Sequence, residues 1–195
     1  MKRLGLLGGT FDPPHYGHLV AAQEVAWQLH LEQVLFLPAR QNPLKEDFSS
    51  DSEHRFEMVC RAIADNPLFA ASRVDLDRPP PSYTADLLRT LHSPDQELYF
   101  IVGADILPEL ERWRSPGEIL RLARLAVVNR PGAPPPAVAL QLLRPGARER
   151  VDLVEIPGVA IASRDLRQRV ADGRPITYLT PPAVERYIAE QRLYV

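Results

Sequence analysis

The segment Gly8-Gly9-Thr10-Phe11-Asp12-Pro13-Pro14-His15-Tyr16-Gly17-His18 decides the fold class of this chain. It follows the short apolar run 4–7, and residues 2–8 predict a buried first strand. Glycines after a strand let the backbone approach a ligand closely, and N–H groups at the start of the next helix favour an anion. The segment therefore predicts a phosphate-binding turn between a first strand and a first helix.

Two histidines mark the entrance of that helix. His15 and His18 are three residues apart, so they can share one side of the helix, and Gly17 between them leaves room for a nucleotide against the chain. Such a pair could also bind zinc, but a third ligand of the usual kind is missing nearby, and Asp12 is the one candidate. The spacing favours contact with phosphate over a zinc site.

Strand-like and helix-like segments alternate along the rest of the chain. Apolar runs predict strands over residues 34–37, 69–76, 98–102, 125–129 and 151–156. Helical spacing predicts helices over residues 19–29, 50–64, 83–91, 163–171 and 182–191. Ser50 and Glu53 have capping-box spacing for the second of these helices, and the proline-rich segments 77–82 and 133–145 predict loops.

This alternation predicts an α/β fold, namely a Rossmann-like, doubly wound, mostly parallel sheet with helices on both faces. In such sheets ligands bind beyond the carboxyl ends of the strands, at the point where the strand order reverses. The residues that follow the predicted strands are therefore the first candidates for a site.

Composition limits the kind of partner. The chain has 195 residues, of which 45% are hydrophobic, enough for the core of a single domain. A net charge of −2 gives no overall basic field, so a nucleic-acid partner is not expected, while a small anion in a local pocket is compatible with it. The single cysteine, Cys60, fits a reducing compartment. With no secretory or membrane-spanning segment apparent, the expected location is the cytoplasm.

The opening segment resembles the signature of the His-x-Gly-His nucleotidyltransferase superfamily. Within it, the chain is similar to bacterial nicotinate-nucleotide adenylyltransferases over essentially its whole length. Four further segments carry this resemblance in the family's order: residues 37–45 (Leu-Pro-Ala-Arg-Gln-Asn-Pro-Leu-Lys), residues 82–88 (Ser-Tyr-Thr-Ala-Asp-Leu-Leu), residues 100–105 (Phe-Ile-Val-Gly-Ala-Asp) with Trp113, and residues 161–167 (Ile-Ala-Ser-Arg-Asp-Leu-Arg).

The resemblance implies a reaction and a single nucleotidyltransferase domain over residues 1–195, in which the C-terminal helical part, about 160–195, completes the ATP site. The family joins ATP to nicotinate mononucleotide and releases pyrophosphate, a late step towards NAD. The mononucleotide phosphate attacks the α-phosphorus of ATP. Because this nucleophile is already ionised at neutral pH, the protein needs to supply positioning and charge neutralisation but no general base.

The resemblance also implies a role for each matching residue. The implied catalytic residues, which contact the ATP phosphates, are His15, His18 and Arg167. The implied ATP-binding residues are Gly8, Gly9, Thr10, Phe11, Gly17, Lys45, Gly103, Asp105, Ser163 and Arg167. The implied residues for nicotinate mononucleotide are Thr10, Phe11, Tyr83, Thr84 and Trp113, whose ring could stack on the pyridinium. Mg²⁺ is expected to arrive with ATP, since no carboxylate cage is visible in the sequence.

Two positions depart from the family pattern. Leu44 stands before Lys45 where the family usually has histidine, and Arg164 stands after Ser163 where it usually has threonine. Each change removes one polar contact, but neither removes His15, His18 or Arg167. The sequence therefore predicts an active enzyme.

Three rival functions stay open at this point. Phosphopantetheine adenylyltransferase uses the same ATP site, but it would not need Ser82-Tyr83-Thr84. A non-catalytic nucleotide sensor would be expected to lack one of the implied catalytic residues, and a fragment of a class I tRNA synthetase would need a tRNA-binding domain. The preference for nicotinate over nicotinamide mononucleotide is unresolved, as is assembly into a homo-oligomer.

Overall fold

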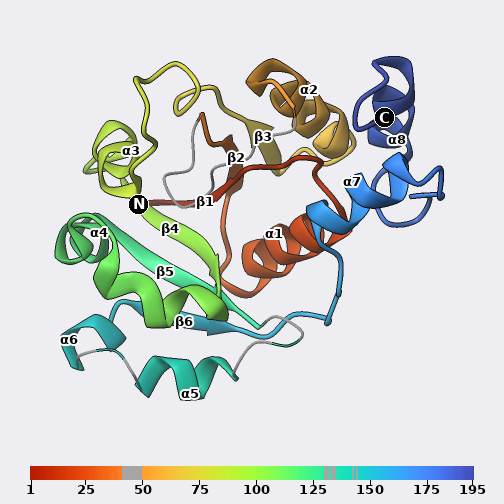
Figure 1. Ribbon diagram of the computed structural model, residues 1–195. Helices are drawn as coiled ribbons and strands as arrows, with labels where there is room; N and C mark the ends of the chain where they lie inside the picture. Colours follow the sequence, from red (N-terminus) through yellow and green to blue (C-terminus); the bar gives the residue numbers. More distant parts are fainter. Residues whose placement is uncertain (41–49, 130–131, 133–134, 142, 144) are drawn as a thin grey trace. The chain divides into compact units, whose positions relative to one another are not determined.

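A computed structural model of the chain describes residues 1–40, 50–129, 132, 135–141, 143 and 145–195 (Figure 1). The elements in chain order are β1 (Lys2–Gly9), α1 (Tyr16–Gln28), β2 (Gln33–Pro38), α2 (Ser52–Ile63), β3 (Phe69–Ala71), α3 (Thr84–Leu91), β4 (Gln96–Gly103), the 3₁₀ helix η1 (Ala104–Arg112), α4 (Pro116–Leu122), β5 (Ala123–Val128), α5 (Pro136–Gln141), α6 (Pro145–Arg148), β6 (Val151–Val154), α7 (Ser163–Ala171) and α8 (Pro182–Glu190).

Within the described residues the strands form one six-stranded sheet in the order β3-β2-β1-β4-β5-β6. The pairs β1–β4, β4–β5 and β5–β6 are parallel, with Leu6 opposite Phe100 and Phe100 opposite Leu125. The strand order reverses between β1 and β4, which is the arrangement of a doubly wound Rossmann-like sheet. The α/β class predicted from the sequence is confirmed.

The chain folds as two compact units, each built from several segments. Unit 1 contains Met1–Leu7, Val20–Leu35 and Tyr83–Val159. Unit 2 contains Gly8–Leu19, Phe36–Ser82 and Ala160–Val195. The prediction of a single domain over residues 1–195 stays a prediction.

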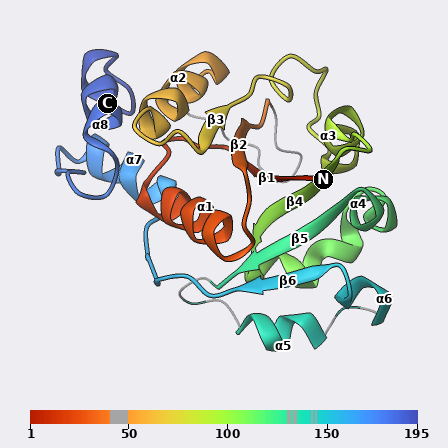
Figure 2. The same cartoon turned by 180° about the vertical axis from the view of Figure 1, so that it is seen from behind.

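In unit 1, β4, β5 and β6 lie side by side, and α5 runs alongside β6 in both views (Figures 1 and 2). Helix α4 contacts α3 and β5. The apolar runs 98–102 of β4 and 125–128 of β5 are buried; Leu98 and Leu125 are each 1% exposed. Burial on both faces of the sheet explains why these runs are apolar without interruption.

In unit 2, helices α2 and α8 pack against each other, as both views show (Figures 1 and 2). Their shared core contains Met58, Val184 and Ile188, with Leu166 of α7 and Ile176. The C-terminal helices are therefore part of the same compact body as the opening loop, since both belong to unit 2.

Several predicted boundaries were wrong. Helix α2 begins after Asp51, whose carboxylate accepts the Glu53 N–H at 2.8 Å, so Ser50 is not its N-cap. β3 ends at Ala71 because the chain turns over residues 74–77 instead of continuing as a strand. The expected loop 133–145 contains α5, and the sequence prediction also missed η1, α4 and α6.

Other elements follow the sequence closely. α7 has the predicted bounds, and Gly173 ends it with a φ of +67°, a conformation that glycine adopts without steric cost. The first helix begins at Tyr16, three residues earlier than expected, so Gly17 and His18 lie inside it. Among the described residues no helix combines the length and the apolar character needed to cross a membrane.

Two glycines of unit 1 give a matched test of this packing. A Cβ on Gly5 of β1 would lie 2.8 Å from Leu31 Cδ1 and 3.0 Å from Val34 Cγ2, whereas a Cβ on Gly117 of α4 would meet nothing within 4 Å. We expect Gly5→Ala to lower the free energy of unfolding by about 1–3 kcal/mol through overpacking. Gly117→Ala should leave it unchanged or raise it by up to about 1 kcal/mol.

Urea unfolding of both variants, followed by circular dichroism, measures the difference through the transition midpoints. Equal midpoints for the two variants would contradict the close packing of β1 against Leu31 and Val34.

Candidate active site

The opening loop leaves β1 at Gly9 and enters α1 at Tyr16. Phe11 lies between them with a φ of +52°, in the left-handed region that non-glycine residues seldom occupy. Its ring is 1% exposed and lies 5.7 Å from the ring of Phe36, centroid to centroid. A Cβ at Gly9 would lie 3.0 Å from this ring, so a larger residue there would press on the Phe11 side chain. The aromatic side chain anchors the loop in unit 2.

The two histidines of the motif stack on each other. Their ring centroids are 3.7 Å apart with an interplanar angle of 23°, and the Phe11 ring meets His18 edge-on at 5.0 Å. The His15 backbone N–H donates to His18 Nδ1 at 3.2 Å. Because Nδ1 accepts a hydrogen bond, a neutral His18 carries its proton on Nε2. This tautomer presents a hydrogen-bond donor at the far end of the ring.

The first turn of α1 uses its own N–H groups within the protein. The N–H of Tyr16 donates to Leu179 O at 3.2 Å, and that of His18 donates to His15 O at 2.9 Å. Together with the His15 N–H, three donors that a helix N-terminus could offer to an anion are engaged. The positive character of this site therefore depends mainly on side chains.

Ser163 and Arg167 of α7 belong to the same unit and contact this loop. Ser163 Oγ donates to Pro13 O at 2.8 Å, and Arg167 Nη1 donates to Asp12 O at 2.9 Å. The N-cap of α7 is Ala162, so the Ser163 hydroxyl is not a capping group. A guanidinium has five N–H donors, so Arg167 can hold the loop and still bind an anion. Their implied contacts with ATP phosphates stay predictions.

Sequence reasoning missed three residues that hold the loop: Arg55, Thr180 and Tyr194. Arg55 Nη1 donates to Thr10 O at 2.9 Å, Thr180 Oγ1 donates to Pro14 O at 2.7 Å, and the Tyr194 hydroxyl donates to Asp12 Oδ1 at 2.6 Å. Arg55 could have been found, because it shares a helical stripe of α2 with buried Met58, Val59 and Ile63. The other two carry no local signal.

Unit 1 holds the residues predicted for the acceptor. Tyr83 is the N-cap residue of α3, Thr84 begins that helix, and the Arg114 guanidinium lies 4.6 Å over the Tyr83 ring. Arg114 is also 3.8 Å from Asp86 Oδ2. An aromatic ring and a cation therefore stand together at the start of α3, a combination suited to a ligand with both aromatic and anionic parts.

Gly103, Asp105 and Trp113 also lie in unit 1. Gly103 ends β4, Asp105 is in the first turn of η1, and Trp113 is the C-cap residue of η1. The Trp113 ring meets Phe100 edge-on at 6.3 Å, and its Nε1 is buried with no hydrogen-bond partner among the described residues.

The structure thus places the predicted residues in two sets. Unit 2 brings together the loop residues Gly8, Gly9, Thr10, Phe11, His15, Gly17 and His18 with Ser163 and Arg167. Unit 1 contains Tyr83, Thr84, Gly103, Asp105 and Trp113. Lys45 and Leu44 lie outside the described residues. The described part of the chain contains no group of three potential metal-binding side chains.

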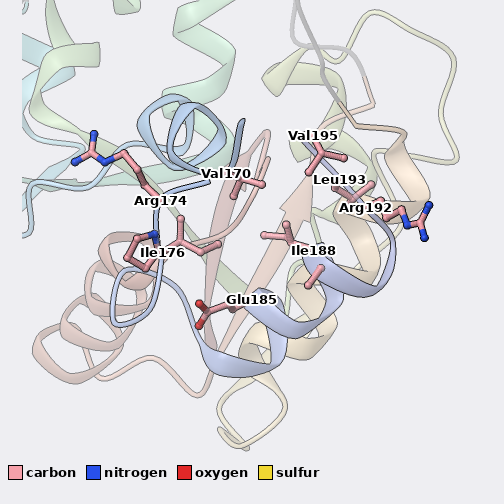
Figure 3. A pocket seen from close by; sticks show the side chains of 10 residues that line it. Val170, Arg174, Ile176, Glu185, Ile188, Arg192, Leu193 and Val195 are labelled. Atoms are coloured by element: carbon pink, nitrogen blue, oxygen red, sulfur yellow. The ribbon is translucent and has the colours of Figure 1, made fainter. Parts of the chain in front are cut away.

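A separate cavity of about 270 Å³ lies near the C-terminus of the chain (Figure 3). Its lining includes Arg174, Ile188 and Arg192, and none of the predicted site residues belongs to it. Leu193 and Val195, on either side of Tyr194, also face it. The candidate active site is therefore distinct from this cavity.

The fold and the stacked His-x-Gly-His pair define a class of nucleotide-transferring proteins. The chain belongs to the cytidylyltransferase-like family, whose model matches residues 6–169. It is 51% identical to the "Probable nicotinate-nucleotide adenylyltransferase" of Roseiflexus sp. (strain RS-1), over 98% of this chain and 97% of the relative. It is 47% identical to the protein of the same name from Mycobacterium tuberculosis (strain ATCC 25618 / H37Rv), over 98% of this chain and 91% of the relative.

A solved structure has the same fold. The Plasmodium falciparum nicotinic acid mononucleotide adenylyltransferase complexed with NaAD superposes with a TM-score of 0.82 at 20% identity, over 100% of this chain and 98% of that one. The resemblance to nicotinate-nucleotide adenylyltransferases inferred from the sequence motifs is confirmed.

The hydrogen bond from His15 N–H to His18 Nδ1 predicts one tautomer. We expect a long-range ¹H–¹⁵N spectrum at about pH 9, where imidazoles are neutral, to show His18 with its proton on Nε2. Comparison with the spectrum of His18→Asn assigns the signal, and the exposed His92 serves as a reference for a solvated ring. A proton on His18 Nδ1 would contradict the observed loop geometry.

Proposed function

We propose that this protein transfers the adenylyl group of ATP to nicotinate mononucleotide, forming nicotinate adenine dinucleotide and pyrophosphate. The observation that carries the proposal is the 51% and 47% identity, over 98% of the chain, to proteins named for this activity. The loop geometry supports it, because the stacked histidines present the His18 Nε2 donor, and the Asp12 carboxylate of the loop is held by Tyr194 and Arg167. Such a site suits a reaction whose nucleophile is already an anion.

The residues of unit 2 would act on the phosphates of ATP. His18 would donate from Nε2 to a non-bridging oxygen of the α-phosphoryl group, where negative charge grows during the transfer. His15, stacked on His18, would hold that ring in place, and Arg167 would neutralise charge on the leaving pyrophosphate through its remaining N–H groups. Gly8, Gly9 and Gly17 would let the nucleotide approach the backbone.

The residues of unit 1 would bind the acceptor and the ribose. Trp113 would stack on the pyridinium ring. Thr84 would hold the nicotinate carboxylate beside Tyr83. Gly103 and Asp105, at the end of β4, would contact the ribose of ATP.

We infer that Mg²⁺ enters with ATP and is held by phosphates and water. When bound, it would shield charge on the phosphates and so assist departure of pyrophosphate. The location that goes with this reaction is the cytoplasm, where ATP is available. Neither nucleic acid nor a membrane is needed as a partner.

The activity itself is tested with purified protein, Mg²⁺ and ATP. Pyrophosphate release is measured with nicotinate mononucleotide, nicotinamide mononucleotide or phosphopantetheine as acceptor, and EDTA replaces Mg²⁺ in a parallel reaction. We expect the highest kcat/KM with nicotinate mononucleotide and loss of turnover in EDTA. Absence of pyrophosphate with nicotinate mononucleotide, or faster reaction with phosphopantetheine, would refute the proposed function.

Two substitutions separate the chemical role of His18 from its structural one. In His18→Asn, the side-chain oxygen can still accept the His15 N–H bond while the Nε2 donor is lost, so kcat should fall by about 10²-fold in a folded protein. The kcat of His18→Ala should fall at least as far. His18→Gln places an amide N–H near the Nε2 position and should retain more activity than His18→Asn.

His92 is exposed, so His92→Ala provides the control, and its kcat should match that of the unsubstituted protein. An unchanged kcat in folded His18→Asn would assign His18 a structural role alone.

A further inference from the structure

The carboxylate of Asp12 is a buried charge at the centre of the opening loop. The residue is 1% exposed, and it follows Phe11, whose backbone has a φ of +52°. A buried carboxylate is tolerated when hydrogen bonds and opposite charges surround it. The Tyr194 hydroxyl donates to Oδ1 at 2.6 Å, and Arg167 Nη1 lies 3.9 Å from Oδ2.

A buried arginine shares this environment. Arg55 is 1% exposed, and its guanidinium donates to Thr10 O at 2.9 Å and to Arg40 O at 3.4 Å. Burial lowers the pKa of Arg55, and the nearby charge of Asp12 opposes that effect. The Asp12 charge therefore supports the cation that holds the carbonyl of Thr10, just before Phe11.

The backbone of Tyr194 is turned so that its ring enters this cluster. Tyr194 has a φ of +67°, while Val195 next to it is 88% exposed. The hydroxyl bond to Asp12 then fixes the direction of the ring. Burial, and next the Asp12 charge, raise the pKa of Tyr194, so its hydroxyl keeps the proton that it donates.

We propose that Tyr194 is a positioning residue for adenylyl transfer, acting through Asp12 to hold the loop that carries His15 and His18. The proposal rests on the proposed function. Asp12 is joined to Phe11, and the Phe11 ring contacts His18, so displacement of the carboxylate shifts the ring that carries the Nε2 donor. Many groups contribute to substrate binding, whereas the transfer step requires the His18 ring to be placed correctly against one oxygen of the α-phosphoryl group. Loss of the hydroxyl should therefore lower kcat more than it raises KM.

Tyr194→Phe removes the hydroxyl alone. We expect kcat to fall by about tenfold with the KM values for ATP and nicotinate mononucleotide within about threefold, because a hydrogen bond to a buried charge is among the stronger ones. Tyr178→Phe is the matched control. Tyr178 lies in the same unit with the same φ of +67° but is 88% exposed, so the kcat of Tyr178→Phe should equal that of the unsubstituted protein.

Two further variants exclude a purely structural effect. Leu31→Ala weakens the packing against Gly5 in unit 1 and leaves the core around Tyr194 unchanged, so the Tm of this variant should fall while its kcat at 25 °C stays normal. Asp12→Asn keeps an acceptor for the hydroxyl but loses the charge. If Tyr194 acts through Asp12, Tyr194→Phe should lower kcat by a smaller factor in the Asp12→Asn background than alone. If Tyr194→Phe does not fold, Asp12→Asn alone should show the fall in kcat with little change in KM.

The outcomes separate this proposal from the proposed function. An unsubstituted protein without activity would refute the function itself. An active protein in which folded Tyr194→Phe retains kcat within about twofold, or changes KM alone, would overturn the positioning role. If Tyr194→Phe lowers kcat by the same factor in the unsubstituted protein and in Asp12→Asn, Tyr194 does not act through Asp12.

Discussion

The buried carboxylate of Asp12 is the constraint on which the rest of unit 2 depends. An unpaired charge at this depth would cost several kcal/mol, so the fold must bring donors to it. Its partners come from far along the sequence. Tyr194 of the C-terminal segment donates a hydrogen bond to the carboxylate, Arg167 of α7 forms an ion pair with it at 3.9 Å, and the cation of Arg55 in α2 lies nearby. The opening loop is therefore complete when α2, α7 and the C-terminal segment are packed together.

The loop uses its backbone for structure and its side chains for chemistry. The carbonyls of Thr10, Asp12, Pro13 and Pro14 all accept hydrogen bonds from side chains of unit 2. Three N–H groups at the start of α1 are also engaged within the protein. The backbone therefore has little freedom to adjust, and the stacked imidazoles keep a defined direction. A preorganised donor of this kind stabilises charge without the cost of reorganising at the moment of reaction.

The parts predicted from the sequence are those encoded by neighbouring residues. Apolar runs located β1, β2, β4 and β6, and Gly173 located the end of α7, because burial and left-handed backbone leave local patterns. The loop motif located the stacked histidines. Asp51 displaced Ser50 as the cap of α2, since two polar residues in succession made either one suitable. The proline-rich segment concealed α5, because proline is well tolerated in the first turn of a helix, where Pro136 stands.

The support of the loop could not be predicted, because it joins residues up to 182 positions apart. Arg55 alone left a trace, as a charged residue on the buried face of an amphipathic helix. Its chemistry also explains why this position suits arginine. One guanidinium bonds the carbonyls of Thr10 and Arg40 at once, through two nitrogens held in a planar fork. A lysine ammonium would be a more strongly hydrated point charge, which is costlier to bury, and it would lack that fixed fork. An arginine on an otherwise apolar helical stripe is therefore a sequence signal for a buried backbone clamp.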